Sequence, residues 1–204
     1  MCFLLGICLA FYIGFSACNS ICKVFLIKFL SALCFALLFY KFSFSIPFFL
    51  FAFLTFSLFS VSVVDYFHKI IPVMFPVLLI IIGIMFSFLN ATLGKTFLLR
   101  FANSLLGIFI GGGILFALGS LWQLIYKMEG IGGGDVKLMA GIGAFIGFER
   151  VLIAILLAAI LGSITGLVLI AIKKIKRKDY MPFGPFLSIA SFIAIFIPSS
   201  IIDF

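Results

Sequence analysis

The stretch "VLIAILLAAILGSITGLVLIAI", residues 151–172, decides the class of fold, because no charged side chain interrupts it. A helix needs roughly 20 apolar residues to cross the hydrocarbon core of a bilayer, and this run is long enough. The rest of the chain has the same character: 66% of its 204 residues are hydrophobic and 10% are charged. A water-soluble domain needs far more polar surface. The sequence therefore predicts an integral membrane protein with one membrane-embedded domain over residues 1–204.

The predicted fold is all-α, a polytopic membrane helix bundle of about eight transmembrane or re-entrant helices. Strand crossings are not expected, because the apolar runs are longer than the alternating segments of a membrane barrel. One run, 136–148, is too short to span the bilayer unless it is tilted, extended or re-entrant. The eight predicted segments are 2–17, 24–40, 46–64, 72–90, 101–126, 136–148, 151–172 and 182–202.

The net charge of +8 lies in short connections between these runs, which indicates topology signals and contacts with lipid headgroups and not a nucleic-acid surface. Cytoplasmic loops carry an excess of Lys and Arg. Assigning alternate connections to opposite sides puts nine basic residues on one side and four on the other. This predicts both termini outside and places the loops holding Asp65 and Asp135 on the cytoplasmic side. The nine are Lys23, Lys69, Lys127, Lys137, Lys173, Lys174, Lys176, Arg177 and Lys178, and the four are Lys41, Lys95, Arg100 and Arg150.

Two of the six acidic residues, Asp65 and Asp135, stand within a few residues of the apolar edge of a predicted span. An ionised carboxylate loses hydration in such a place and is a candidate functional group. Two carboxylates brought together repel each other, so the pair holds a single proton near neutral pH. The ionised member can deprotonate water while the protonated member donates to a carbonyl, as in aspartic proteolysis.

Three glycines, Gly132, Gly133 and Gly134, precede Asp135. We expect them to allow unusual φ values and close approach of an extended substrate. Glu129 beside them either attracts a basic peptide or pairs with Lys127 as an interfacial charge. The other glycine clusters indicate helix packing; they are Gly111 to Gly113 and the series Gly141, Gly143 and Gly147.

Other chemistries fit the residues less well. No metal site is expected, because His68 is the only histidine and has no second one at helical spacing. A phosphate-binding loop would need a Gly-Lys-Ser/Thr ending, which "GIGGGDVK" lacks. The alternative function is a cation- or proton-coupled transporter, or a non-catalytic membrane scaffold, that uses Asp65 and Asp135 as ion sites.

The stretch "GIGGGDVKLMAGIGAFIG" resembles the GxGD motif of the type IV prepilin peptidases, with Gly132, Gly134 and Asp135 at the motif positions and Lys137 in the usual continuation. Two further stretches follow the family's order. "VDYFHKIIP" resembles the segment of the first aspartate, here Asp65, and "MPFGPFLSIA", residues 181–190, resembles the start of the last helix.

The resemblance implies a membrane aspartic endopeptidase that removes the basic leader from type IV prepilins or pseudopilins at the cytoplasmic face of the inner membrane. It implies Asp65 and Asp135 as the catalytic pair, and it implies neither a metal nor a cofactor for proteolysis. We expect Gly132, Gly133, Gly134, Glu129 and Lys137 on the substrate-binding side of the site. Prepilins or pseudopilins and membrane lipids are the expected partners, and nucleic acid is not one.

One departure from the family concerns a second activity. Larger members resemble this chain but insert a cytoplasmic domain with two CxxC pairs after the first helix, and they also N-methylate the new terminus. Here only "CNSICK", residues 18–23, joins the first two predicted spans. We therefore expect no separate N-terminal methyltransferase or zinc domain, and no methylation by this chain. A relative of presenilin also fits less well, since this chain has the order Asp65-Tyr66 in place of Tyr-Asp.

Overall fold

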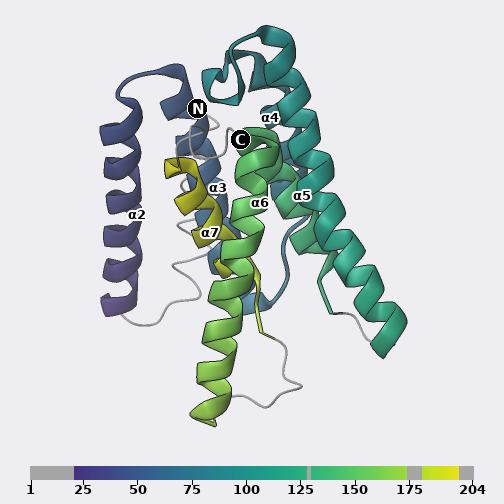
Figure 1. Ribbon diagram of the computed structural model, residues 1–204. Coiled ribbons are helices and arrows are strands. Elements are labelled where there is room, and N and C mark those ends of the chain that lie inside the picture. The colour runs from purple at the N-terminus through teal and green to yellow at the C-terminus, as the bar shows by residue number, and fades with distance from the viewer. Residues whose placement is uncertain (1–20, 128–129, 174–180, 198–204) are drawn as a thin grey trace.

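The computed structural model describes residues 21–127, 130–173 and 181–197, and these residues are helical with no strand among them (Figure 1). The predicted all-α class is confirmed. The bundle contains α2 (Ile21–Phe42), α3 (Ile46–His68), α4 (Met74–Phe86), α5 (Phe97–Tyr126), α6 (Gly133–Ala171) and α7 (Gly184–Phe196), with two short 3-10 helices, η1 (Ser87–Leu89) and η2 (Ala91–Leu93).

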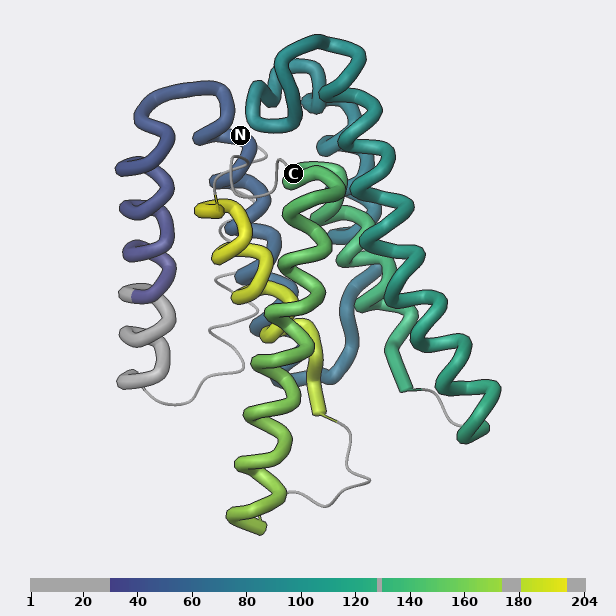
Figure 2. Tube along the Cα trace, viewed as in Figure 1, coloured from purple at the N-terminus to yellow at the C-terminus, as the bar shows by residue number. Residues whose placement is uncertain are grey.

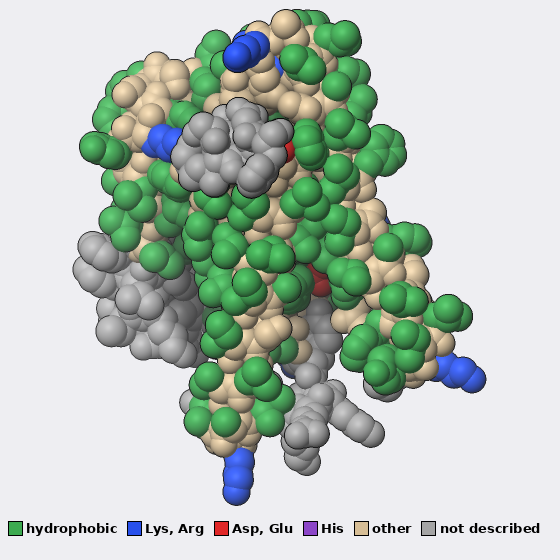
Figure 3. All heavy atoms as spheres, viewed as in Figure 1, with side chains coloured by type: hydrophobic (Ala, Val, Ile, Leu, Met, Phe, Trp, Pro, Cys, Tyr) green, Lys and Arg blue, Asp and Glu red, His purple; other side chains and the backbone are tan. Residues whose placement is uncertain are grey.

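Three helices are long and apolar enough to cross a bilayer: α3, α5 and α6. Hydrophobic side chains cover most of the face shown in Figure 3, and the visible Lys and Arg lie toward the ends of the molecule. Large apolar side chains such as Leu98 and Leu124 are 76% and 79% exposed. Exposing so much apolar surface to water is unfavourable, whereas the same surface is compatible with the lipid tails of a bilayer. The surface is that of an integral membrane protein.

The described residues form six α-helices, so the predicted number of about eight is not confirmed. The first predicted segment, 2–17, lies outside the described residues. The segment 72–90 is broken, because α4 ends at Phe86 and the chain continues through η1 and η2. There the Asn90 side chain accepts hydrogen bonds from the backbone N–H and the hydroxyl of Thr92, which holds a turn in place of another helical turn.

The helix α6 is two helices joined at Gly147, whose φ of 81° and ψ of 173° interrupt the helical backbone. A Cβ added at Gly111 would lie 2.6 Å from Met139 O and 2.9 Å from Val151 Cγ2, so residues on both sides of Gly147 approach the same point. Figure 2 shows the chain rising to this turn and descending again. The prediction of two separate segments, 136–148 and 151–172, is therefore confirmed, and the shorter one folds back along the longer.

Glycine contacts hold α5 against the shorter arm of α6. The backbones of Gly107 and Gly143 touch, since a Cβ added at either would overlap the carbonyl of the other. Such contact requires the absence of side chains. Gly141 is packed in the same way, against Leu79 Cβ at 2.8 Å from its added Cβ. The packing interpretation is confirmed for the other glycines of the two clusters, but Gly113 faces open space and Gly147 forms the positive-φ turn of α6.

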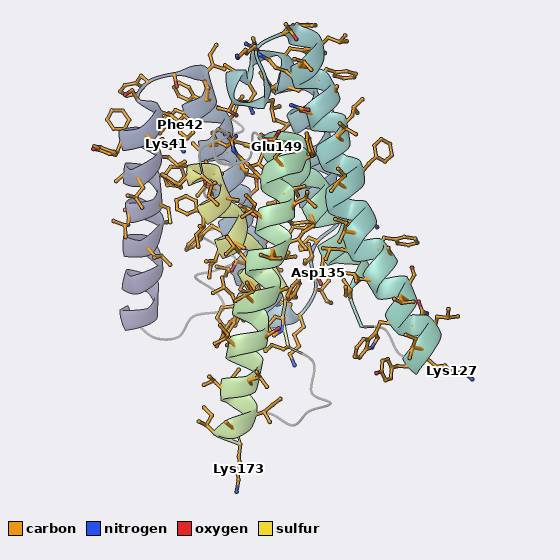
Figure 4. The ribbon with its side chains drawn as sticks, in the orientation of Figure 1. Lys41, Phe42, Lys127, Asp135, Glu149 and Lys173 are labelled. Atoms are coloured by element: carbon orange, nitrogen blue, oxygen red, sulfur yellow. The ribbon has the colours of Figure 1, made fainter. Side chains whose placement is uncertain are left out.

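Three basic residues, Lys41, Lys127 and Lys173, are divided between the two ends of the bundle as the charge pattern predicts for them (Figure 4). Figure 4 shows Lys127 and Lys173 at one end, with Lys41 and Glu149 at the other. The α5 helix reaches its end at Lys127, which adopts a left-handed conformation with φ 54° and donates its N–H to Gln123 O.

The contact between Gly107 and Gly143 leads to a stability test. We expect Gly143→Ala to destabilise the folded bundle by about 1–3 kcal/mol, because the new methyl group must push the two helix backbones apart. Thermal unfolding in detergent, followed by circular dichroism, measures the change. Gly113→Ala is the matched control, since its methyl group enters open space and gains helix propensity. Equal midpoints for the two variants would contradict the packing.

Candidate active site

Asp65 lies in the last turn of α3 and is 1% exposed. The helix ends there because Lys69 turns into a left-handed conformation, φ 55°, and donates its N–H to the backbone carbonyl of Asp65. The Asp65 carboxylate accepts a hydrogen bond from the N–H of Gly184, 2.8 Å from Oδ2. Gly184 is the first residue of α7, where backbone N–H groups have no partner within the helix. The N-terminus of α7 thus stabilises the negative charge of Asp65.

Gly184 has no room for a side chain. A Cβ built on it would lie 2.7 Å from Asp65 Oδ2 and 3.1 Å from Asp65 Cβ. This position was not predicted as part of the site, although the stretch "MPFGPFLSIA" had been singled out. Pro182 and Pro185 around it were an available signal, since proline in the first turn marks a helix start with free N–H groups.

Asp135 lies in the first turn of α6, and its backbone N–H donates to Gly132 O at 3.0 Å. The side chain is 4% exposed, and its Oδ1 atom has no hydrogen-bond partner in the described part of the chain. An unpartnered buried oxygen is costly in a folded protein and often marks a position that a ligand or proton completes. Both carboxyl groups have a backbone N–H partner, Gly184 for Asp65 and Gly132 for Asp135, but Asp135 keeps one buried oxygen, Oδ1, without a partner among the described residues.

The fold brings these two carboxyl groups together, as predicted. The charge of Asp65 acts on the Asp135 carboxyl directly. A packing contact joins the same two segments, because a Cβ added at Gly134 would lie 2.9 Å from the Cβ of Ile71, six residues beyond Asp65. Asp135 at the start of α6 and Asp65 at the end of α3 thus lie close enough for their charges to interact, and the start of α7 contacts Asp65.

The glycines before Asp135 act differently from the expectation of unusual φ values. None of Gly132, Gly133 and Gly134 has a positive φ, because Gly132 precedes α6 with an extended backbone and the other two are its first helical residues. Gly134 packs closely on Ile71 of the chain itself, while Gly133 is exposed and has open space where a Cβ would be.

Of the remaining predicted residues, the structure describes Lys137 and does not describe Glu129. Lys137 is exposed, two positions after Asp135 in α6. Figure 4 shows Asp135 set back from Lys127 and Lys173, which end α5 and follow α6. The two carboxyl groups are therefore within the bundle, and α5 and the longer arm of α6 extend beyond them.

Residues 51–167, which hold both aspartates and extend from α3 into α6, match the type IV leader peptidase family. The chain belongs to this family. The resemblance seen in the GxGD stretch is thereby confirmed, and the match covers Gly132, Gly134 and Asp135 together with Asp65.

Individual prepilin leader peptidases are 29–41% identical to the chain over the aligned residues. A prepilin leader peptidase/N-methyltransferase of Stutzerimonas stutzeri is 29% identical over 142 residues, 70% of this chain and 47% of that protein. One from Aeromonas salmonicida is 30% identical over the same shares. A shorter match, to the protein of that name from Burkholderia pseudomallei, is 41% identical over 78 residues, 37% of this chain and 25% of that protein. The chain thus spans about half the length of the first two relatives, and no solved structure matches it.

The packing of Gly184 against Asp65 leads to a second stability test. We expect Gly184→Ala to lower the free energy of unfolding by about 1–3 kcal/mol, because its methyl group displaces the carboxylate. In an Asp65→Ala background the same substitution should cost much less, since the oxygen that it strikes is gone. Thermal unfolding in detergent of the four combinations measures the coupling. Strict additivity would show that the two residues do not touch.

Proposed function

We propose that the protein is an aspartic endopeptidase that cleaves the basic leader from type IV prepilins or pseudopilins. The observation that carries the proposal is the meeting of two buried aspartates from different helices, one with a backbone donor and one with a free oxygen. Membership of the type IV leader peptidase family supports the same substrate class. The relatives named above are described as prepilin leader peptidases.

The surroundings of the two acids assign their roles. Asp65 accepts the Gly184 N–H at a helix N-terminus, which favours its ionised form. Two neighbouring buried carboxyl groups do not both ionise readily, and we assign the shared proton to Asp135 because its buried Oδ1 has no partner among the described residues. Asp65 then acts as general base, and Asp135, whose Oδ1 has no competing partner, acts as general acid.

The reaction follows from these roles. Asp65 removes a proton from a water molecule, whose oxygen attacks the carbonyl carbon of the scissile peptide bond. Asp135 donates its proton to the carbonyl oxygen, which gives a tetrahedral diol. The carbon–nitrogen bond then breaks, the proton on Asp65 passes to the leaving nitrogen, and a diol hydroxyl returns a proton to Asp135. Both acids end in their starting states.

The substrate-binding part of the proposal concerns Gly132, Gly133, Gly134, Lys137 and Glu129. Gly133 is exposed with open space beside it, so an extended peptide backbone can pass close to the loop there. Exposed Lys137 lies next to that path, and Glu129 carries a charge that attracts a basic leader. Each of these residues precedes or follows Asp135 within a few positions.

The proposed location is the cytoplasmic (inner) membrane, crossed several times, with the aspartates toward the cytoplasm. Lys127 and Lys173 lie at the end of the bundle to which the α5 and α6 extensions point, and basic residues concentrate on cytoplasmic loops. A basic leader would reach the site from that side. Membrane lipids are then the permanent surroundings of the exposed apolar helices.

The proposal covers peptide-bond cleavage within one membrane-embedded domain, residues 1–204, and does not extend to N-methylation. The six residues "CNSICK" between the first two predicted segments leave no room there for an inserted domain.

Replacing either aspartate tests the function. We expect Asp65→Asn and Asp135→Asn each to lower the rate of leader cleavage at least 100-fold, because each removes one proton-transferring group. Cleavage of a co-expressed prepilin, resolved by mass spectrometry, measures the rate and the cleavage position. Membrane insertion and yield of both variants should equal those of the wild type. Normal cleavage by either variant would contradict the mechanism, and proton- or cation-coupled uptake without cleavage would favour a transporter.

Gly133 tests the substrate path. We expect Gly133→Ala to raise KM about tenfold with the thermal midpoint unchanged, since the methyl group enters space that the substrate backbone would use. Gly113→Ala adds a methyl group to open space on α5, away from the loop, and should leave KM unchanged. Steady-state cleavage of a prepilin peptide in detergent provides the comparison. An unaltered KM in Gly133→Ala would place the substrate elsewhere.

A further inference from the structure

The last turns of α5 hold the loop that leads into Asp135. The indole of Trp122 lies directly against Gly130: an added Cβ there would overlap the ring at Cδ1 and lie 2.5 Å from Cγ and 2.9 Å from Nε1. One turn earlier, an added Cβ at Gly119 would lie 3.3 Å from the Cβ of Ile131. Two consecutive loop residues thus rest on one face of α5, at positions three residues apart in the helix.

The contact with Gly130 differs from the other surroundings of Trp122, which are typical of an aromatic residue at a membrane surface. The side chain is 46% exposed and packs on the ring of Tyr126 at a centroid distance of 4.3 Å, and Tyr126 is itself 55% exposed. An aromatic pair of this kind is common where a membrane meets water. A tryptophan that only anchors the protein at the membrane surface does not need a glycine against its ring. Here, any side chain at Gly130 would displace the indole of Trp122.

The loop is held from two sides before it reaches Asp135. Trp122 seats Gly130 from α5, and Ile71 packs on Gly134 from the segment after α3. Gly133 between them touches neither side. Only four residues separate Gly130 from Asp135, so a shift of the seated glycine is passed to the first turn of α6.

We propose that Trp122 is a positioning residue for the proposed peptidase reaction: its indole seats Gly130 and thereby fixes Asp135 relative to Asp65. The inference rests on the proposed function of the two aspartates. Misplacing a reacting group by about 1 Å can cost roughly 100-fold in rate, so a displaced loop lowers kcat while the remote parts of the substrate still bind.

A double-mutant cycle tests the contact through the reaction. Wild type, Gly130→Ala, Trp122→Ala and the double variant are compared as full chains in detergent, with a prepilin peptide as substrate. We expect Gly130→Ala to lower kcat about tenfold or more with KM within about twofold, as misplacement of the acid requires. In the Trp122→Ala background, Gly130→Ala should lower kcat little further, because the ring that its methyl group would overlap is absent. Trp122→Phe, which keeps an aromatic ring, should recover part of the lost kcat.

Fluorescence gives a readout that does not depend on cleavage. Trp122 is the only tryptophan in the chain, so its emission reports the position of this one ring. Gly130→Ala should shift the emission maximum with an unchanged thermal midpoint, and Gly113→Ala should not shift it. Wild-type kcat and emission in Gly130→Ala, or an equal loss of kcat with and without Trp122, would overturn the positioning role. A wild type that cleaves no prepilin would instead remove the proposed function, and this role with it, even where the emission still shifts.

Discussion

A carboxylate buried in an apolar helix bundle needs a hydrogen-bond donor, and the backbone N–H of Gly184 supplies one to Asp65 across 119 positions of sequence. The start of α7 is therefore tied to the end of α3. One turn further along α7, the hydroxyl of Ser188 donates to Leu58 O at 3.1 Å, which continues the same contact between the two helices. This constraint sets the depth of α7 and leaves no space for a side chain at Gly184.

The second aspartate is held by packing of backbones. The shorter arm of α6 lies against α5 where Gly107 meets Gly143, and hydrogen bonds reinforce this region. Ser104 Oγ donates to Ala144 O at 2.9 Å, and Asn90 Nδ2 donates to Phe145 O at 2.9 Å. Asp135 thus stands at the free end of a short, firmly packed helix, which suits a group whose position decides a reaction rate.

The two acids gain different properties from these two kinds of support. A donor at Asp65 favours charge, whereas the unpartnered Oδ1 of Asp135 is available to carry and deliver a proton. Ile71 on one side and Trp122 on the other hold the glycine loop between α5 and α6. The different roles proposed for these two chemically identical residues therefore rest on the backbone contacts around each of them.

The membrane class, the motifs and the two aspartates could be predicted from the amino-acid sequence alone. The uncharged run 151–172 established a membrane protein, and the order of "VDYFHKIIP", "GIGGGDVKL" and "MPFGPFLSIA" pointed to Asp65 and Asp135 before any helix was placed. The break between 136–148 and 151–172 was also predicted, because Glu149 and Arg150 interrupt the apolar residues there. The local sequence is enough for these predictions, since membrane spans and motifs are each formed by residues close together in the sequence.

Other features required the folded molecule. Local pattern did not reveal that Gly147 folds α6 back on itself, that Gly184 donates to Asp65, or that Gly130 lies under Trp122. Nor did it reveal that the glycines before Asp135 keep ordinary φ values. The chain by itself determined the membrane class, the motif and the identity of the two acids. Only the tertiary structure decided that Asp65 receives a hydrogen bond from Gly184, because that depends on helix ends far apart in sequence being packed to within hydrogen-bonding distance.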